Sequence, residues 1–197
     1  ALRCLYFIHQ SLYIRKGVSM KQTKFIAGVL LSFIFLILFF SCENEQEEIP
    51  DFHEEALQIQ EQYRPGFAVR KLKHLLIYCY GLCQEYELDY EIVKAVIATE
   101  SHWNPIALSS ADCKGLMQIS EGAASQLQSS DADLFDPYVN ITLGVLYLSW
   151  LQGKYNGDTK KMLKAYHEGP GRVDKAGILN YRKDTYVNKV LHLAARN

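Results

Sequence analysis

The sequence predicts a predominantly α-helical protein with little or no β-sheet. Apolar residues recur at a spacing of three or four over six segments, and the alternating patterns typical of strands are nearly absent. Pro, Gly and Asn-Gly signals stand between these segments, where helices are expected to begin or end. The predicted helices span residues 68–86, 90–101, 121–128, 138–154, 159–167 and 184–195.

The first part of the chain is interpreted as a signal sequence that precedes the folded protein. Residues 25–40 are all apolar, Gly or Ser, and they follow Met20 and two lysines. This run is shorter than the roughly 20 residues that span a bilayer, and its length is typical of the apolar region of a signal peptide. Residues 1–19 are interpreted as an upstream translation artefact, because Met20 is the better start.

A lipid attachment site is predicted at Cys42. Ser41 and Cys42 end the apolar run, and a polar, acidic stretch follows at once. This pattern resembles the lipobox of bacterial lipoproteins, in which the cysteine is lipidated and becomes the mature N-terminus. Phe39 stands where lipoboxes usually carry Leu, so an uncleaved anchor is the alternative.

Residues 42–66 are predicted to be an acidic tether, extended or transiently helical, because they are dense in Glu and Gln. The folded domain is expected at 67–197, which is about 130 residues and enough for one compact core. Of the 21 Lys and Arg, five precede Cys42, which leaves 16 against all 22 Asp and Glu, a formal charge of −6. This acidic balance disfavours nucleic acid as a partner.

Three cysteines remain in the predicted domain, at positions 79, 83 and 113. Cys79 and Cys83 lie one helical turn apart beside several leucines, which favours small core residues over a disulfide. A bridge from Cys113 to either of them is the alternative that export permits. No metal site is predicted, because a zinc site using His74 has no fourth ligand at a sensible spacing.

The helix predicted at 90–101 carries a candidate catalytic acid at its end. Asp89 is a suitable N-cap, and Ile92 and Val96 begin an apolar stripe that Glu100 continues. Glu100 should therefore project from the buried face, near the carbonyl end of the helix. Burial and the negative end of the helix dipole both raise the pKa of a carboxyl group. A carboxylic acid still protonated near neutral pH is suited to general-acid catalysis, although fraying of the helix into solvent is an equal alternative on position alone.

Four stretches occur in an order that resembles the catalytic domain of lytic transglycosylases. They are Glu100-Ser101 with Trp103-Asn104-Pro105, Ser109 with Gly115-Leu116-Met117-Gln118, Asn140-Ile141 with Gly144, and Ala165-Tyr166 with Gly169-Pro170-Gly171. A late Tyr186-Val187 before an amphipathic helix also resembles the closing segment of the family. The resemblance implies a lysozyme-like fold and cleavage of the bond between N-acetylmuramic acid and N-acetylglucosamine in peptidoglycan.

The mechanism that the resemblance implies uses a single carboxyl group and no cofactor. Glu100 protonates the glycosidic oxygen, and the 2-acetamido group of the substrate stabilises the developing positive charge. Glu100, now ionised, removes a proton from the sugar's 6-hydroxyl, which attacks the anomeric carbon and gives a 1,6-anhydro-muramic end. The intramolecular nucleophile removes the need for the second carboxyl group of hydrolytic glycosidases.

Further roles are implied residue by residue. Ser109 and Gln118 are expected to hydrogen-bond the acetamido and hydroxyl groups of the glycan, and Tyr166 to orient Glu100 through its phenol. Gly115 is expected to let the backbone pass close to the sugar. His167 occupies a position where the family commonly has a substrate-contacting Asn. Without the resemblance, a turn, a solvated helix start and core packing are the ordinary interpretations of such residues.

Two alternatives follow from departures from the family pattern. Asp112, Glu121 and Glu168 each offer a second carboxylate, so a hydrolytic, goose-type lysozyme is the second hypothesis. A catalytically inactive peptidoglycan-binding lipoprotein is the third. Trp103 is expected either to stack on a sugar or to anchor the end of its helix. The protein itself is expected to be a monomer that is anchored by a lipid in the cell envelope and faces the periplasm or cell wall.

Overall fold

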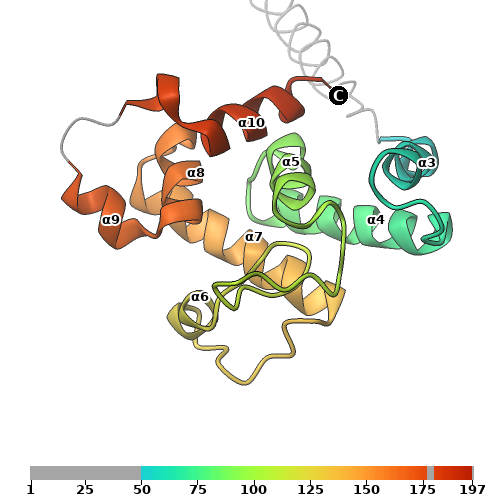
Figure 1. Cartoon of the computed structure of the whole chain (residues 1–197), viewed down its shortest axis with the longest axis horizontal. Coiled ribbons are helices and arrows are strands. Elements are labelled where there is room, and N and C mark those ends of the chain that lie inside the picture. Colours follow the sequence, from blue (N-terminus) through green and yellow to red (C-terminus); the bar gives the residue numbers. More distant parts are fainter. Residues whose placement is uncertain (1–49, 177–179, 197) are drawn as a thin grey trace, which may run out of the picture. The chain divides into compact units, whose positions relative to one another are not determined.

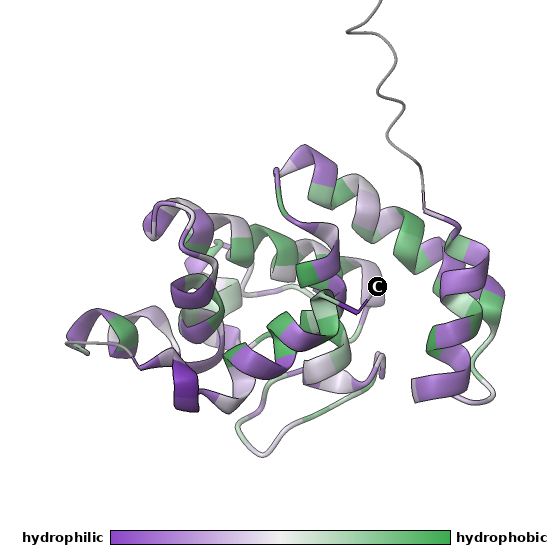
Figure 2. Ribbon diagram, turned by 90° about the horizontal axis from the view of Figure 1, so that it is seen from above, coloured by the Kyte–Doolittle hydropathy of each residue, from purple (hydrophilic) through white to green (hydrophobic). Residues whose placement is uncertain are grey.

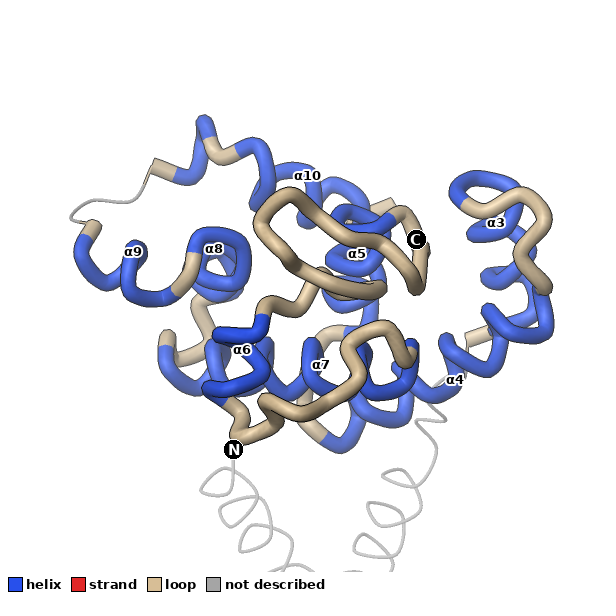
Figure 3. Tube along the Cα trace, turned by 60° about the horizontal axis from the view of Figure 1, so that its bottom comes forward, coloured by secondary structure: helices blue, strands red, loops and turns tan. Residues whose placement is uncertain are grey.

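The computed structural model describes residues 50–176 and 180–196. The predicted signal sequence and Cys42 lie outside these described residues. Within them every regular element is a helix (Figure 3). The strand-like pairing in the described residues consists of two isolated bridges, Leu108 with Lys114 and Lys114 with Ile119. The prediction of a predominantly α-helical protein is confirmed. No helix in the described ranges is long and apolar enough to cross a membrane.

The helices agree with the six predicted segments to within two residues at each end. The described elements are α3 (Phe52–Tyr63), α4 (Val69–Glu85), α5 (Tyr90–Ser101), α6 (Glu121–Gln126), α7 (Pro137–Lys154), α8 (Thr159–Glu168), α9 (Pro170–Lys175), the 3-10 helix η1 (Tyr181–Lys183) and α10 (Thr185–Ala194). Three of these elements, α3, α9 and η1, were not among the predicted helices.

Helix α3 shows that the prediction of a tether over residues 42–66 is wrong in its second half. The compact unit begins at Pro50 and not at residue 67. Phe52, Ala56 and Ile59 are buried at helical spacing, and α3 packs against α4. Lys94 of α5 also forms an ion pair with Glu55 of α3. This apolar stripe consists of only three residues, and it is hard to recognise in the sequence because Glu and Gln are so frequent in this segment.

The segment Gly169-Pro170-Gly171 ends one helix and begins another. Helix α8 ends at Glu168, as predicted, and Gly169 adopts a φ of 86°. Pro170 then occupies the first turn of α9, where its fixed φ is favourable and its missing N–H costs nothing. The predicted stop is therefore confirmed, but the helix that follows it was not predicted.

The helices share one core, in which α5 is held from several sides (Figure 1). Helix α4 packs against α3, α5 and α7, and α10 packs along α5. Helix α8 packs against α7, α9 and α10. Ile141, Leu148 and Leu151 are fully buried, so α7 runs through the core. Figure 2 shows apolar and polar residues interspersed along the helices, as expected for amphipathic helices around a common core.

The three cysteines of this part of the chain are free thiols. Cys79 and Cys83 are fully buried in α4, while Cys113 is partly exposed in the loop before α6. The interpretation of Cys79 and Cys83 as small core residues is confirmed. The alternative, a disulfide bond between Cys113 and one of them, is not present in this part of the chain.

Candidate active site

Glu100 stands in the last turn of α5, as the sequence predicts. The helix begins where the carboxylate of Asp89 accepts hydrogen bonds from the backbone N–H groups of Glu91, at 2.9 Å, and Ile92, at 3.3 Å. It ends at Ser101, and His102 adopts the left-handed conformation with φ 50°. The chain therefore leaves α5 sharply, one residue after the carboxyl group.

Trp103 holds the backbone in the sharp turn that follows α5. Its φ is also positive, at 59°, and only 1% of its surface is exposed. Two successive residues other than Gly in this conformation are costly, and the burial of a large indole offsets that cost. Of the two expectations for Trp103, anchoring the end of the helix is the one that the structure supports, because the side chain is not available to stack on a sugar.

The carboxyl group of Glu100 is half-buried and has one close polar partner. The phenol of Tyr186 in α10 donates a hydrogen bond to Oε1 of Glu100 at 2.7 Å. Burial raises the pKa of Glu100 above its ordinary value, against the opposing effects of this hydrogen bond and of positive charge on His167 and Lys189. The carboxyl group is thus biased toward its protonated form while it remains within reach of solvent.

The orienting role predicted for Tyr166 belongs to Tyr186. The phenol of Tyr166 donates its hydrogen bond to the backbone carbonyl of Met117 at 2.7 Å. A phenol has one proton, so Tyr166 cannot also donate to Glu100. The prediction that Tyr166 orients Glu100 is therefore wrong. Tyr166 instead fastens α8 to the loop that precedes α6.

His167 lies next to the contact between Tyr186 and Glu100. Its imidazole stacks on the ring of Tyr186 with a centroid distance of 4.2 Å and an interplanar angle of 9°. The imidazole is exposed, whereas the ring of Tyr186 is 8% exposed. Residues from α5, α8 and α10 therefore meet at one point, with His167 on its outer side.

Ser109 and Gln118 both shape the loop between α5 and α6. The hydroxyl of Ser109 accepts hydrogen bonds from the backbone N–H groups of Ala111, at 3.3 Å, and Cys113, at 3.0 Å. The amide nitrogen of Gln118 donates to the carbonyls of Ala107, at 3.2 Å, and Gly115, at 3.0 Å. These bonds leave the hydroxyl proton of Ser109 and the amide oxygen of Gln118 as the groups with which each would contact a ligand. Their predicted roles in substrate binding remain predictions.

Asn140 of α7 holds this loop from beneath. It is fully buried, and its amide oxygen accepts from the backbone N–H of Met117 at 2.7 Å. Its amide nitrogen donates to the carbonyls of Lys114 and Leu134, both at 2.8 Å. One side chain thereby forms hydrogen bonds to three backbone groups that belong to no helix.

Gly115 is required by this packing around Asn140. Its φ is 77°, and a Cβ there would lie 2.3 Å from the amide of Asn140 and 2.5 Å from the carbonyl of Leu134. The close approach to Asn140 and Leu134 is by itself enough to require a glycine, and the predicted approach of this backbone to a sugar remains a prediction. Gly144 has a similar function, because a Cβ there would lie 2.1 Å from the sulfur of Met117.

The three carboxylates that could support a hydrolytic mechanism form ion pairs with lysines. Asp112 and Glu121 lie 3.5 Å and 3.2 Å from Nζ of Lys114. Glu168 lies 2.6 Å from Nζ of Lys164. Glu100 differs from all three, because its described partner is the neutral phenol of Tyr186.

A cavity of about 610 Å³ lies on the opposite face of α5. It opens between α3, α5 and the C-terminal end of α10, and Glu91, Lys94, Ala95 and Ala98 line it from α5. These positions are about half a turn around the helix from Glu100. We therefore place the candidate site at the contact between Glu100 and Tyr186 and not in this cavity.

Comparisons with known proteins show which family the chain is similar to. The family described as "Transglycosylase SLT domain" matches residues 81–189. A membrane-bound lytic murein transglycosylase C from Sodalis glossinidius is 36% identical over 106 residues, which are 46% of this chain and 30% of that protein. A putative soluble lytic murein transglycosylase from Haemophilus influenzae is 37% identical over 99 residues, which are 47% of this chain and 17% of that protein.

Solved structures show the same similarity. Lytic transglycosylase Slt from Pseudomonas aeruginosa, solved as an inactive Glu→Gln mutant, is 26% identical with a TM-score of 0.53. The match covers 71% of this chain and 26% of that one. The chain thus spans about a third or less of the length of these proteins. The family match covers more than half of the chain and includes Glu100, the loop before α6 and Tyr186, so the chain belongs to the transglycosylase SLT domain family.

Proposed function

We propose that this chain is a lytic murein transglycosylase. It cleaves the β-1,4 bond between N-acetylmuramic acid and N-acetylglucosamine without water and leaves 1,6-anhydro-muramic ends. The family match and the names of its relatives support the substrate and the reaction class. The observation that carries the proposal is the half-buried carboxyl group of Glu100, with a raised pKa and a hydrogen bond from Tyr186.

Glu100 acts first as acid and then as base. In its protonated form it donates to the glycosidic oxygen, and the burial that raises its pKa favours this form. The carboxylate that results accepts the hydrogen bond from Tyr186, which stabilises the negative charge. It then removes the proton of the 6-hydroxyl as that oxygen attacks the anomeric carbon. The inactive Glu→Gln form of the Pseudomonas protein is consistent with a requirement for one such carboxyl group.

The source of the attacking oxygen distinguishes this proposal from a lysozyme. Sacculi digested by the purified protein in oxygen-18 water are expected to yield muramic ends without the label, lighter than hydrolysed ends by one water. The reason is that the sugar's own hydroxyl is the nucleophile, whereas a second carboxylate would activate water. Mass spectra of the released fragments measure both quantities. Labelled, reducing ends as the main product would contradict the proposal and favour the hydrolytic alternative with Asp112, Glu121 or Glu168.

We also propose that the chain is held in the cell envelope by a lipid on Cys42. The relative from Sodalis glossinidius is named as membrane-bound, and Cys42 follows an apolar run and precedes an acidic stretch. Residues 43–49 would then be the short link between the lipid and the folded unit that begins at Pro50. The substrate would be the glycan strands that lie near that membrane, and the chain would act on them as a monomer.

Replacement of Cys42 by alanine tests this anchor. Cells grown with a labelled fatty acid are expected to label the native protein, which should partition into detergent, because acyl chains drive membrane binding. Cys42→Ala is expected to abolish the label, since the thiol that accepts the lipid is gone. Cys113→Ala is a matched control that removes a thiol from the folded unit. Equal labelling of native and Cys42→Ala protein would exclude Cys42 as the lipid site.

A further inference from the structure

The imidazole of His167 contacts Tyr186, which in turn contacts the candidate acid. It lies flat on the Tyr186 ring at 4.2 Å, and the hydroxyl of that ring donates to Glu100 at 2.7 Å. The three side chains come from α8, α10 and α5 in that order. A change at His167 can therefore reach Glu100 by two routes, the position of the Tyr186 ring and the charge of the imidazole.

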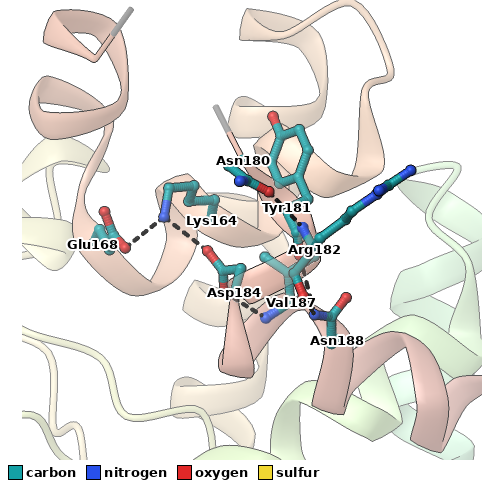
Figure 4. Close-up of polar contacts among 8 residues, drawn as sticks. All are labelled: Lys164, Glu168, Asn180, Tyr181, Arg182, Asp184, Val187 and Asn188. Carbon is teal, nitrogen blue, oxygen red and sulfur yellow. Dashed lines mark hydrogen bonds and ion pairs between the residues drawn. The ribbon is translucent and has the colours of Figure 1, made fainter. Parts of the chain in front are cut away.

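An ion-pair cluster fixes the two helices that carry the stack (Figure 4). Nζ of Lys164 in α8 donates to Glu168 at 2.6 Å and to Asp184, the N-cap of α10, at 2.7 Å. The side chains of Lys164 and Asp184 are 17% and 9% exposed, so water screens this contact little. Because the cluster joins the C-terminal part of α8 to the N-cap of α10, it holds His167 in register with Tyr186.

The imidazole is surrounded by groups of both signs. Its charge acts on Glu100 of α5 and on Asp184, the N-cap of α10, and it stacks on Tyr186 of α10. Lys189, in the middle of α10, acts on Glu100, and Lys164 of α8 pairs with Asp184 and with Glu168, the residue after His167. Burial raises the pKa of Glu100, and positive charge on His167 acts in the opposite direction. A cation at this position stabilises the carboxylate that Glu100 becomes when it gives up its proton.

We propose that His167 is a positioning residue for the reaction proposed above: its ring holds the Tyr186 hydroxyl on Glu100, and its positive charge favours transfer of the Glu100 proton to the glycosidic oxygen. The inference rests on the proposed function and adds a role for a residue that the family resemblance assigns only to contact with substrate. A substrate contact through His167 would act on KM, whereas action through Tyr186 acts on kcat.

Two substitutions separate the stacking from the charge. With soluble glycan strands as substrate, His167→Ala is expected to lower kcat about five-fold with KM within two-fold, because loss of an aromatic stack frees the Tyr186 ring. His167→Phe restores the stack, so its kcat should return to within two-fold of the native value. The alkaline limb of the rate profile should nevertheless move to higher pH in His167→Phe. Without the cation the pKa of Glu100 rises, and the acid stays protonated to higher pH.

A double-mutant cycle with Tyr186→Phe tests the route. If His167 acts through the Tyr186 hydroxyl, His167→Ala should change kcat less than two-fold in the Tyr186→Phe background. Equal effects of His167→Ala in both backgrounds would overturn the inference. A rise in KM with unchanged kcat and unchanged pH profile would overturn it as well, because that is the signature of direct contact with substrate.

A measurement without substrate keeps this inference separate from the proposed function. Carbon-13 NMR of the glutamate carboxyl groups, with the Glu100 signal assigned by its loss in Glu100→Gln, follows the titration of Glu100 in the resting protein. The midpoint is expected at higher pH in His167→Phe than in the native protein, and identical midpoints would overturn the inference. Failure of the proposed function would appear elsewhere, as native protein that releases no fragments from sacculi.

Discussion

Glu100→Gln is expected to retain the fold and to lower the release of fragments from sacculi by about a thousand-fold, within the range by which one general acid accelerates a reaction. The amide has nearly the shape of the carboxyl group and can still accept a hydrogen bond from Tyr186. It cannot donate a proton to the glycosidic oxygen and recover it. The rate of fragment release, measured on equal amounts of folded protein, gives the size of the effect.

The stability of this variant should be equal to or slightly above that of the native protein. Burial already disfavours the charge of Glu100, as its raised pKa indicates, and an uncharged amide avoids that cost. Thermal unfolding followed by circular dichroism measures this. A variant that melts well below the native protein would show that Glu100 is a structural residue, and one that digests sacculi at the native rate would show that it is not the acid.

Glu121→Gln is the matched control for this experiment. It makes the same chemical change at a side chain that is 72% exposed and pairs with Lys114 at 3.2 Å. An exposed ion pair contributes about 1 kcal/mol or less, so the fold should be unaffected. Activity should also stay within two-fold of the native value. A large loss of activity in Glu121→Gln would favour the hydrolytic alternative, in which a second carboxylate activates water.

The partly buried position of Glu100 at the end of its helix could be predicted from the sequence because its signal is local. Asp89 marks the start of α5, and Ile92, Val96 and Glu100 follow at intervals of four residues on one face. The period of the helix alone places Glu100 on the buried side, near the end. The structure confirms the helix from Tyr90 to Ser101 and the partial burial of the carboxyl group.

The residue that hydrogen-bonds to Glu100 could not be predicted in the same way. Tyr186 is 86 residues from Glu100 along the chain, and no spacing rule connects residues on different helices. Two tyrosines, Tyr166 and Tyr186, lie in segments that resemble the family. The sequence predicts that Tyr166 orients Glu100, whereas Tyr186 forms the hydrogen bond to it. Only the packing of α10 along α5 decides between them, because it brings the phenol of Tyr186 to the carboxyl group.

Helix α3 was missed for a different reason, which is composition. Its segment reads as polar because Glu and Gln occupy half of its positions, and disordered tethers have a similar composition. Its buried face consists of Phe52, Ala56 and Ile59. A stripe this narrow stabilises a helix only when a partner surface is already present, and α4 supplies that surface. The many polar residues of α3 therefore indicate its solvent-exposed face correctly, but they make its short buried face hard to recognise in the sequence.

Asn140→Ala is expected to have the largest effect on stability of any single substitution considered for this protein. The native side chain satisfies the N–H of Met117 and the carbonyls of Lys114 and Leu134, and all three bonds are 2.7–2.8 Å long. Alanine leaves the N–H of Met117 and the carbonyl of Leu134 without partners, while the carbonyl of Lys114 keeps its hydrogen bond from the N–H of Ile119 at 3.0 Å, and it leaves a cavity beneath Gly115. Each unsatisfied group costs about 1–3 kcal/mol, so the free energy of unfolding should fall by about 3–5 kcal/mol.

Asn188→Ala is the matched control for this prediction. The amide of Asn188 likewise donates to two carbonyls, those of Tyr181 at 3.0 Å and Arg182 at 3.3 Å, but its side chain is exposed (Figure 4). Water can replace its bonds, so the loss should be below about 1 kcal/mol. Urea unfolding curves of both variants measure the two free energies. Similar losses in Asn140→Ala and Asn188→Ala would contradict the view that the loop before α6 depends on a buried amide.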